Sequence, residues 1–305
     1  MRRFAPLAAV LAALPACSPM GLVDALTPRG GYSAELDLPY GALPRQRLDL
    51  YRPEQPKPGA PTVVFFYGGA WEFGDKGDYR FVAQALASRG YAVAVPDYRL
   101  YPQVRYPAFL EDGAAAVAWL RRNGAAHGLS GGPLALMGHS AGAYIAVMLT
   151  VDGRWLNAVG TSPCAAVAAA VGLSGPYDFL PLTEPNLKEI FGPEDSRPQT
   201  QPVTHVDGRA PPLLLLSGDA DTRVRPRNSA SLAERVHARG GRAKTVVYQG
   251  LGHVQTVAAL ARPLRWLAPV LDDVDRFLAA PPQENCAKPP AFIPVTSNGH
   301  ANVIP

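Results

Sequence analysis

Short apolar runs alternate with helix-length segments along most of this 305-residue chain. The runs at 62–67 and 213–217 are almost continuously apolar, which is typical of strands buried on both faces of a sheet. The segments at 107–123 and 226–239 have the length of ordinary helices. Strands alternating with helices predict an α/β fold, with a mostly parallel central sheet and helices on both of its faces.

With 48% hydrophobic residues the chain supplies one large core, so we expect one domain over 32–280. Inside it, 176–209 is polar and proline-rich and predicts either an extended crossover or a small cap. Residues 281–305 predict a proline-rich tail. Strands are expected at 47–51, 62–67, 91–95, 134–137, 166–173, 213–217 and 243–248, and helices at 78–89, 107–123, 140–150, 226–239 and 270–280.

The first residues are typical of an export signal. Two arginines precede an apolar stretch at 4–14 that is too short to span a bilayer. It ends in Leu-Pro-Ala before Cys17, which resembles the lipobox of bacterial lipoproteins. We therefore expect a signal peptide over 1–16, a lipid on Cys17, a linker over 17–31, and membrane association through the lipid anchor in the periplasm or at the outer membrane. A soluble secreted protein is the alternative.

Charge and cysteine content exclude other classes of protein. The net charge of +4 includes two arginines of the signal, and no Lys or Arg run predicts a nucleic-acid face. No Cys or His pair has metal-ligand spacing, so we expect no metal. Cys164 and Cys286 remain once Cys17 is lipidated, and an oxidising compartment would permit a disulfide between them. Spacing alone leaves that pairing open.

The segment 138–142 reads Gly-His-Ser-Ala-Gly and lies between a predicted strand and a predicted helix. A sharp strand-to-helix turn needs small neighbours on both sides of its central residue. Such a turn lifts the hydroxyl of Ser140 to the edge of the sheet, beside a helix N-terminus that favours developing negative charge. The pattern predicts a nucleophile at Ser140, and a helix-capping serine is the alternative.

A serine hydroxyl is a weak nucleophile and needs a histidine oriented by a carboxylate. The strand at 213–217 runs into Asp219 and Asp221, and the strand at 243–248 runs toward His253. Both turns emerge at the carboxyl edge of the predicted sheet. We therefore predict His253 as the base. Asp221 is favoured over Asp219 as the acid, because it stands at the end of its turn and reaches further toward the His loop.

Two glycines follow the strand at 62–67, in Tyr-Gly-Gly-Ala-Trp at 67–71. Glycines let the main chain approach a substrate closely, so that N–H groups can point at a developing oxyanion. Gly69, Ala70 and Ala141 are the predicted donors. A plain glycine turn, with Trp71 in the core, is the alternative.

These segments together resemble the esterase/lipase branch of the α/β-hydrolases over about 45–280, in particular bacterial feruloyl-esterase-like and hormone-sensitive-lipase-like carboxylesterases. The resemblance implies ester hydrolysis by a Ser-Asp-His triad without a metal or organic cofactor, and it supports the three oxyanion donors. Two residues depart from the pattern, since many relatives have His at Tyr67 and the hormone-sensitive-lipase-like group has Gly at Ala70. The matching segment Asp-Tyr-Arg-Leu at 97–100 is interpreted as structural, with Arg99 pinning a loop.

We therefore expect a carboxylic-ester hydrolase that works through an acyl-enzyme on a small-molecule substrate. Short-chain acyl or aryl esters are preferred, because 176–209 is too polar for the amphipathic lid of a long-chain lipase. Two alternatives stay open: an amidase of the arylformamidase type, and a non-catalytic, envelope-anchored binding protein on the same fold.

Overall fold

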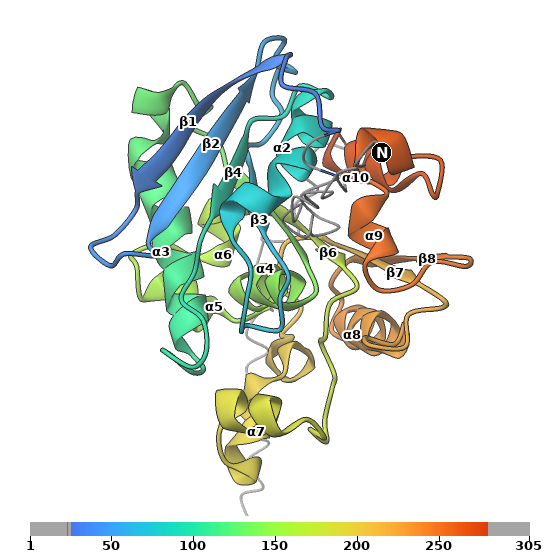
Figure 1. The fold of residues 1–305 in the computed structure, drawn as a ribbon. Helices are drawn as coiled ribbons and strands as arrows, with labels where there is room; N and C mark the ends of the chain where they lie inside the picture. Colours follow the sequence, from blue (N-terminus) through green and yellow to red (C-terminus); the bar gives the residue numbers. More distant parts are fainter. Residues whose placement is uncertain (1–22, 24–25, 280–305) are drawn as a thin grey trace, which may run out of the picture.

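The computed structural model describes residue 23 and residues 26–279 of the chain. The predicted signal peptide of 1–16, Cys17 and the tail of 281–305 lie outside the described residues. The described part is built around an eight-stranded sheet with the order β1-β2-β4-β3-β5-β6-β7-β8 (Figure 1).

The sheet is parallel from β4 to β8, and β1 and β2 run antiparallel at one edge. The predicted, mostly parallel sheet is therefore confirmed. Its strands are β1 (Tyr32–Pro39), β2 (Arg47–Pro53), β3 (Val63–Phe66), β4 (Val93–Pro96), β5 (Leu134–His139), β6 (Val167–Leu173), β7 (Leu213–Gly218) and β8 (Ala243–Tyr248).

Helices cover both faces, because successive side chains of a strand point to opposite sides. In β3 the ring of Phe65 contacts Tyr79, just before α2, while Phe66 lies where α3 packs on α4. The α-helices are α2 (Arg80–Ala87), α3 (Ala108–Asn123), α4 (Ala141–Val151), α5 (Gly153–Asn157), α6 (Pro163–Ala166), α7 (Pro185–Phe191), α8 (Arg227–Ala238), α9 (Gln255–Ala258) and α10 (Val270–Ala279). Short 3₁₀ helices include η1 (Lys76–Tyr79), η3 (Glu194–Thr200) and η4 (Pro202–His205).

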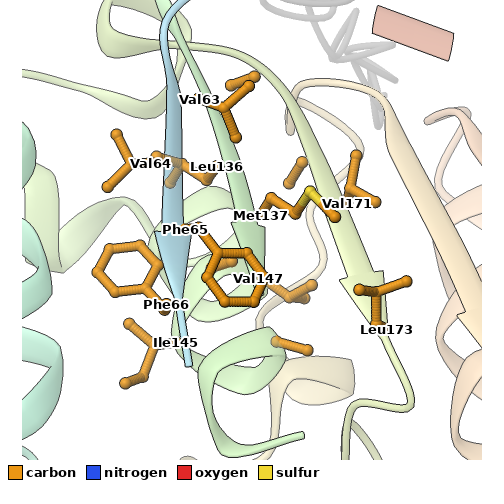
Figure 2. Packing of buried hydrophobic residues seen from close by; sticks show 14 of the residues in the cluster. Val63, Val64, Phe65, Phe66, Leu136, Met137, Ile145, Val147, Val171 and Leu173 are labelled. Atoms are coloured by element: carbon orange, nitrogen blue, oxygen red, sulfur yellow. The ribbon is translucent and has the colours of Figure 1, made fainter. Parts of the chain in front are cut away.

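The core lies around the central strands. Every residue of β3, β4, β5 and β7 is buried, as the continuous apolar runs predict. Figure 2 shows part of this core, with Phe66 of β3 beside Ile145 of α4 and Met137 of β5 beside Val171 of β6. The residues of the edge strands β1 and β8 are exposed or half-buried, except for the buried Tyr248 at the end of β8. The rigid centre of the sheet therefore carries the loops that follow β3, β5 and β7.

Several elements of the fold differ from the sequence-based expectation, among them the unpredicted short helices α5, α6 and α9. Strand β1 was not predicted, because its side chains are mostly exposed and it owes its place to pairing with β2. The segment 176–209 lacks helical periodicity in the sequence, yet it contains α7, η3 and η4. Short helices bury only one or two side chains each, such as Ile190 and Phe191 of α7, so they leave little pattern. Helix α7 lies apart from the sheet at the lower side of Figure 1.

Cys164 in α6 is disulfide-bonded. The other two cysteines, Cys17 and Cys286, lie outside the described residues, so the pairing of Cys164 with Cys286 stays a prediction. Among the residues that the structure describes, no helix has the length and apolar character needed to cross a membrane.

Candidate active site

Ser140 occupies a tight turn between the last residue of β5 and the first residue of α4. Its φ of 53° and ψ of −120° lie in a region that residues with a Cβ rarely adopt. A Cβ at Gly138 would overlap the backbone of Gly142, and a Cβ at Gly142 would overlap the carbonyl group of Phe66. Both glycines are therefore needed so that α4 can pack this closely behind the turn, as the motif predicts.

Ser140, His253 and Asp221 form one hydrogen-bonded chain, although they come from three distant parts of the sequence. The Nε2 of His253 lies 2.9 Å from the Oγ of Ser140. The Nδ1 of His253 lies 2.8 Å from Oδ2 of Asp221. Asp219 is not part of this chain, since it is exposed and its Oδ1 accepts the main-chain N–H of Gly250 at 2.6 Å. The structure thus brings together the three residues that the sequence selected.

The carboxylate of Asp221 is held on both oxygens. Its side chain is fully buried, and Oδ1 accepts the main-chain N–H groups of Arg223 at 3.0 Å and Val224 at 2.8 Å. Burial raises the pKa of Asp221, but the hydrogen bonds from His253 and from Val224 outweigh it and bring the pKa below its ordinary value. The side chain therefore stays ionised at neutral pH and favours a proton on Nδ1 of His253.

The loop that follows β3 lies directly against Ser140. A Cβ at Gly68 would be 2.8 Å from Nδ1 of His139 and 3.2 Å from the Cβ of Ser140, so a larger residue would push the loop away from this turn. Ala70 has a φ of 52° and lines the same pocket as Ser140. Ala141 begins α4, where helix N–H groups have no partner within the helix. The main chain at Ala70 and Ala141 therefore flanks Ser140, with Gly69 next to Ala70 in the same loop.

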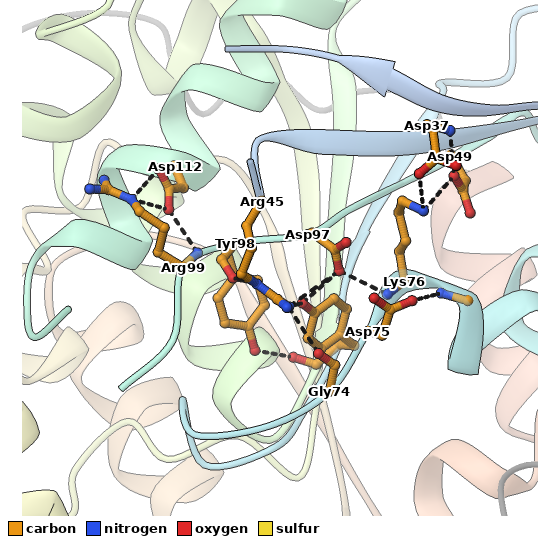
Figure 3. A network of polar contacts seen from close by, with 12 residues as sticks. Asp37, Arg45, Asp49, Gly74, Asp75, Lys76, Asp97, Tyr98, Arg99 and Asp112 are labelled. Atoms are coloured by element: carbon orange, nitrogen blue, oxygen red, sulfur yellow. Dashed lines mark hydrogen bonds and ion pairs between the residues drawn. The ribbon is translucent and has the colours of Figure 1, made fainter. Parts of the chain in front are cut away.

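A buried cluster behind this loop was not predicted. Tyr67 donates its hydroxyl to Oδ1 of Asp97 at 2.8 Å. The Nη2 of Arg45 donates to the hydroxyl of Tyr67 at 2.6 Å and to the carbonyl of Gly74 at 2.9 Å. Figure 3 shows Arg45 reaching across to Asp97 and to the Gly74 loop. Tyr67 thus keeps the loop hydrogen-bonded without a histidine. Arg45 carried no sequence signal, because it lies 52 residues from Asp97.

Arg99 has the structural role that the sequence predicted. Its Nε donates to both carboxylate oxygens of Asp112, at 3.0 and 2.8 Å, and its main-chain N–H donates to Oδ2 at 2.8 Å (Figure 3). Asp112 lies on α3 and is fully buried. This contact joins the segment that follows β4 to α3. The guanidinium of Arg99 is bound to Asp112 and is not part of the chain formed by Ser140, His253 and Asp221.

A pocket of about 670 Å³ opens beside Ser140. Residues 181–187, which precede and begin α7, form one of its walls. Ala70, Trp71 and Glu72 also line the pocket, and the side chain of Asn186 donates to the carboxylate of Glu72. Arg223 lies at the loop that holds Asp221. The remaining lining is mainly apolar or uncharged: Pro176, Phe179, Thr222, Val224 and Asn228. The pocket is large enough for a small ester, with apolar walls and a few charged groups for orientation.

No group of three or more metal-binding side chains occurs within residue 23 and residues 26–279. The arrangement at Ser140 is that of a nucleophile, a base and an orienting carboxylate, which together can transfer an acyl group.

Comparison with known proteins identifies relatives of this chain. The BD-FAE family model matches residues 48–236. A probable isoprenylcysteine α-carbonyl methylesterase of Arabidopsis thaliana is 31% identical over 248 residues, which are 74% of this chain and 52% of the plant protein. The esterase LipC of Mycobacterium tuberculosis is 30% identical over 217 residues, which are 65% of this chain and 54% of LipC. The chain thus spans about half the length of these curated relatives.

Solved structures agree with the fold. Esterase 2 of Thermogutta terrifontis superposes with a TM-score of 0.65 and 25% identity, covering 81% of this chain and 94% of the esterase. The same esterase is also known in a form phosphoramylated by tabun, with the same similarity to this chain. These neighbours and the observed sheet agree on an α/β-hydrolase fold.

Proposed function

Since the chain belongs to the BD-FAE family of α/β-hydrolases, we propose that it is a serine carboxylic-ester hydrolase. The observation that carries this proposal is the hydrogen-bonded chain from Ser140 through His253 to Asp221, at 2.9 and 2.8 Å. Its relatives support the activity, because both curated proteins are named as esterases. The organophosphate adduct of the Thermogutta esterase supports a similarly reactive nucleophile here.

In the proposed first half-reaction, Oγ of Ser140 bonds to the carbonyl carbon while its proton passes to Nε2 of His253. The carbonyl electron pair moves onto oxygen, where main-chain N–H groups of Gly69, Ala70 and Ala141 stabilise the negative charge. Asp221 stabilises the imidazolium. Collapse of the intermediate breaks the bond to the alcohol oxygen, which takes the proton from His253 and leaves an acyl-enzyme.

Water completes the proposed cycle. It attacks the acyl carbon and gives a proton to Nε2 of His253, and a second tetrahedral intermediate forms in the same site. When that intermediate collapses, Oγ of Ser140 leaves and recovers the proton. The carboxylic acid is released, and the enzyme returns to its starting state.

Short-chain acyl or aryl esters fit this site best. Residues 181–187 line the pocket beside Ser140. Trp71 and Phe179 supply flat apolar surfaces in the same pocket. The methylesterase named among the relatives supports a small leaving alcohol. The ester is therefore proposed to be a small molecule, with no metal or organic cofactor in the reaction.

A fluorophosphonate probe combined with a substrate panel tests this function. We expect the probe to label the wild-type chain at Ser140, as located by peptide mass spectrometry, because an activated serine attacks phosphorus as it attacks a carbonyl. We expect p-nitrophenyl acetate and butyrate to be hydrolysed faster than p-nitrophenyl palmitate, feruloyl esters or N-formyl aryl amides. Absence of labelling would favour the binding protein, and preferred cleavage of the amide would favour an amidase.

We also propose that the mature chain is exported and tethered at the cell envelope by a lipid on Cys17. The support is the sequence alone: two arginines, the apolar stretch at 4–14 and the Leu-Pro-Ala-Cys segment. We expect wild-type protein in the membrane fraction of the expressing cell, and the Cys17→Ser variant in the soluble exported fraction or retained with an uncut signal. If Cys17→Ser is found in the same cell fraction as the wild type and migrates to the same position on a gel, lipidation of Cys17 is contradicted.

A further inference from the structure

His139 lies in the middle of the candidate site, although the proposed mechanism does not use it. It is the last residue of β5, and it is buried. A Cβ at Gly68 would be only 2.8 Å from its Nδ1, so its ring packs on the loop that carries the oxyanion donors. The same ring lies 4.9 Å, centroid to centroid, from the ring of His253. His139 therefore contacts the Gly68 loop and the His253 loop at once.

The second ring nitrogen makes a specific contact. Nε2 of His139 lies 3.0 Å from the main-chain carbonyl oxygen of His253. A carbonyl oxygen only accepts hydrogen bonds, so Nε2 must carry the proton and donate it. Burial, with the neighbouring His253, lowers the pKa of His139 to about 3, and the ring is neutral at neutral pH. A neutral ring protonated on Nε2 has a bare Nδ1, and among the described residues Nδ1 finds no hydrogen-bond partner.

A second side chain holds the same carbonyl. The hydroxyl of Thr256 donates to the carbonyl oxygen of His253 at 2.9 Å and also lies 3.0 Å from the hydroxyl of Ser174. Thr256 is fully buried, and Ser174 is almost so. The backbone of His253 is thus held from two directions, by a side chain of the nucleophile turn and by one of α9.

The bare Nδ1 argues for a role beyond filling space. A buried acceptor without a partner costs free energy relative to an apolar group of the same shape, because its lost hydration is not replaced by a hydrogen bond. Leucine at this position would avoid that cost and fill much of the same volume, but it could not hold the carbonyl of His253. The feature that distinguishes histidine from an apolar side chain here is the Nε2–H donor.

We infer that His139 is a positioning residue, which holds the His253 backbone so that the imidazole of His253 stays within reach of Ser140. The inference rests on the proposed function, because its purpose is proton transfer between these two side chains. Since Ser140 directly follows His139, the contact ties the base loop to the nucleophile turn itself. A displacement of about 1 Å between reacting groups costs on the order of 10²-fold in rate.

Kinetics of three variants test the inference. We expect His139→Leu to lower kcat for p-nitrophenyl acetate by about 10²-fold while KM changes little, because positioning acts on proton transfer and not on substrate binding. His139→Gln places an amide N–H near the position of Nε2–H and should recover most of kcat. His237→Leu is the matched control. The Nε2 of His237 lies 2.7 Å from the carbonyl of Ala243 on the exposed side of α8, and its loss should leave kcat unchanged.

Hydrogen exchange supplies a readout independent of activity. We expect the peptide spanning 250–257 to exchange faster in His139→Leu than in the wild type, and in His139→Gln to resemble the wild type. Thr256→Val, which removes the other donor, should loosen the same peptide and serves in place of His139→Leu if that variant does not fold. Circular dichroism at the assay temperature checks that each variant is folded.

The outcomes separate the two proposals. If the wild type hydrolyses no ester, the proposed function fails, and exchange in the 250–257 peptide still decides whether His139 holds the loop. Wild-type kcat and exchange in His139→Leu would overturn the positioning role. An equal loss of kcat in His139→Leu and His139→Gln would also overturn the positioning role. The loss would then reflect the shape of the ring and not its N–H donor.

Discussion

Replacing Ser140 by Ala is expected to reduce kcat for p-nitrophenyl acetate by about 10⁴- to 10⁶-fold and to abolish fluorophosphonate labelling. The substitution removes the hydroxyl oxygen that is proposed to attack the acyl carbon, while His253 and the main-chain N–H groups stay in place. Alanine keeps the Cβ, so the unusual backbone angles of the turn are no harder to adopt than with serine. We therefore expect the circular dichroism spectrum and the melting temperature to stay close to those of the wild type.

Ser88→Ala is the control for this experiment. Ser88 caps the C-terminus of α2, and its hydroxyl donates to the carbonyl of Ala85 at 2.6 Å. The kcat of the Ser88→Ala variant should match that of the wild type. A Ser140→Ala protein that is folded and still turns over the ester at the wild-type rate would rule out Ser140 as the nucleophile.

Asp221→Asn is expected to lower kcat by about 10⁴-fold. Asparagine can keep its oxygen toward the main-chain N–H groups of Arg223 and Val224, which fixes its NH₂ group toward Nδ1 of His253. That nitrogen must then accept, and the proton of the imidazole moves to Nε2, which faces Ser140. A protonated Nε2 cannot take the proton of the serine hydroxyl, so the nucleophile is not activated.

Asp219→Asn is the matched control, two residues away in the same turn. The oxygen of asparagine can still accept the N–H of Gly250, and the side chain does not contact His253. We expect kcat within about threefold of the wild type, since exposed substitutions of this kind change little. A larger loss of kcat in Asp219→Asn than in Asp221→Asn would assign the acid to Asp219 instead of Asp221.

The central part of the fold was predictable because local chemistry and global packing agree there. The runs that became β3, β5 and β7 are apolar on both faces, so their strand character needs no knowledge of neighbours. The small residues around Ser140 signal the turn for a similar reason: Gly142 packs on the carbonyl of Phe66, and no larger residue fits.

Peripheral elements were less predictable. Strand β1 carries Glu35 and Asp37 on a mostly exposed strand, with an irregular register between Glu35 and Leu38. Its strand character comes from hydrogen bonds to β2 and not from its own pattern. The wall of the pocket at 181–187 likewise carries no motif, because it is shaped by the packing of α7 against the rest of the domain.

Within the site, the sequence determined the residue types and their order along the chain. The nucleophile turn, the aspartate turn and the histidine loop each follow a strand, and parallel strands end at one edge, so the order of the elements along the chain already implies that the three turns lie close together. What only the tertiary structure decided are the contacts between side chains far apart in sequence. Among these are the 2.8 Å contact of Asp221 with His253, the hydrogen bond from Arg45 to the hydroxyl of Tyr67, and the contact of His139 with the carbonyl of His253. Such contacts depend on distances set by the packing of whole elements, which no local pattern encodes.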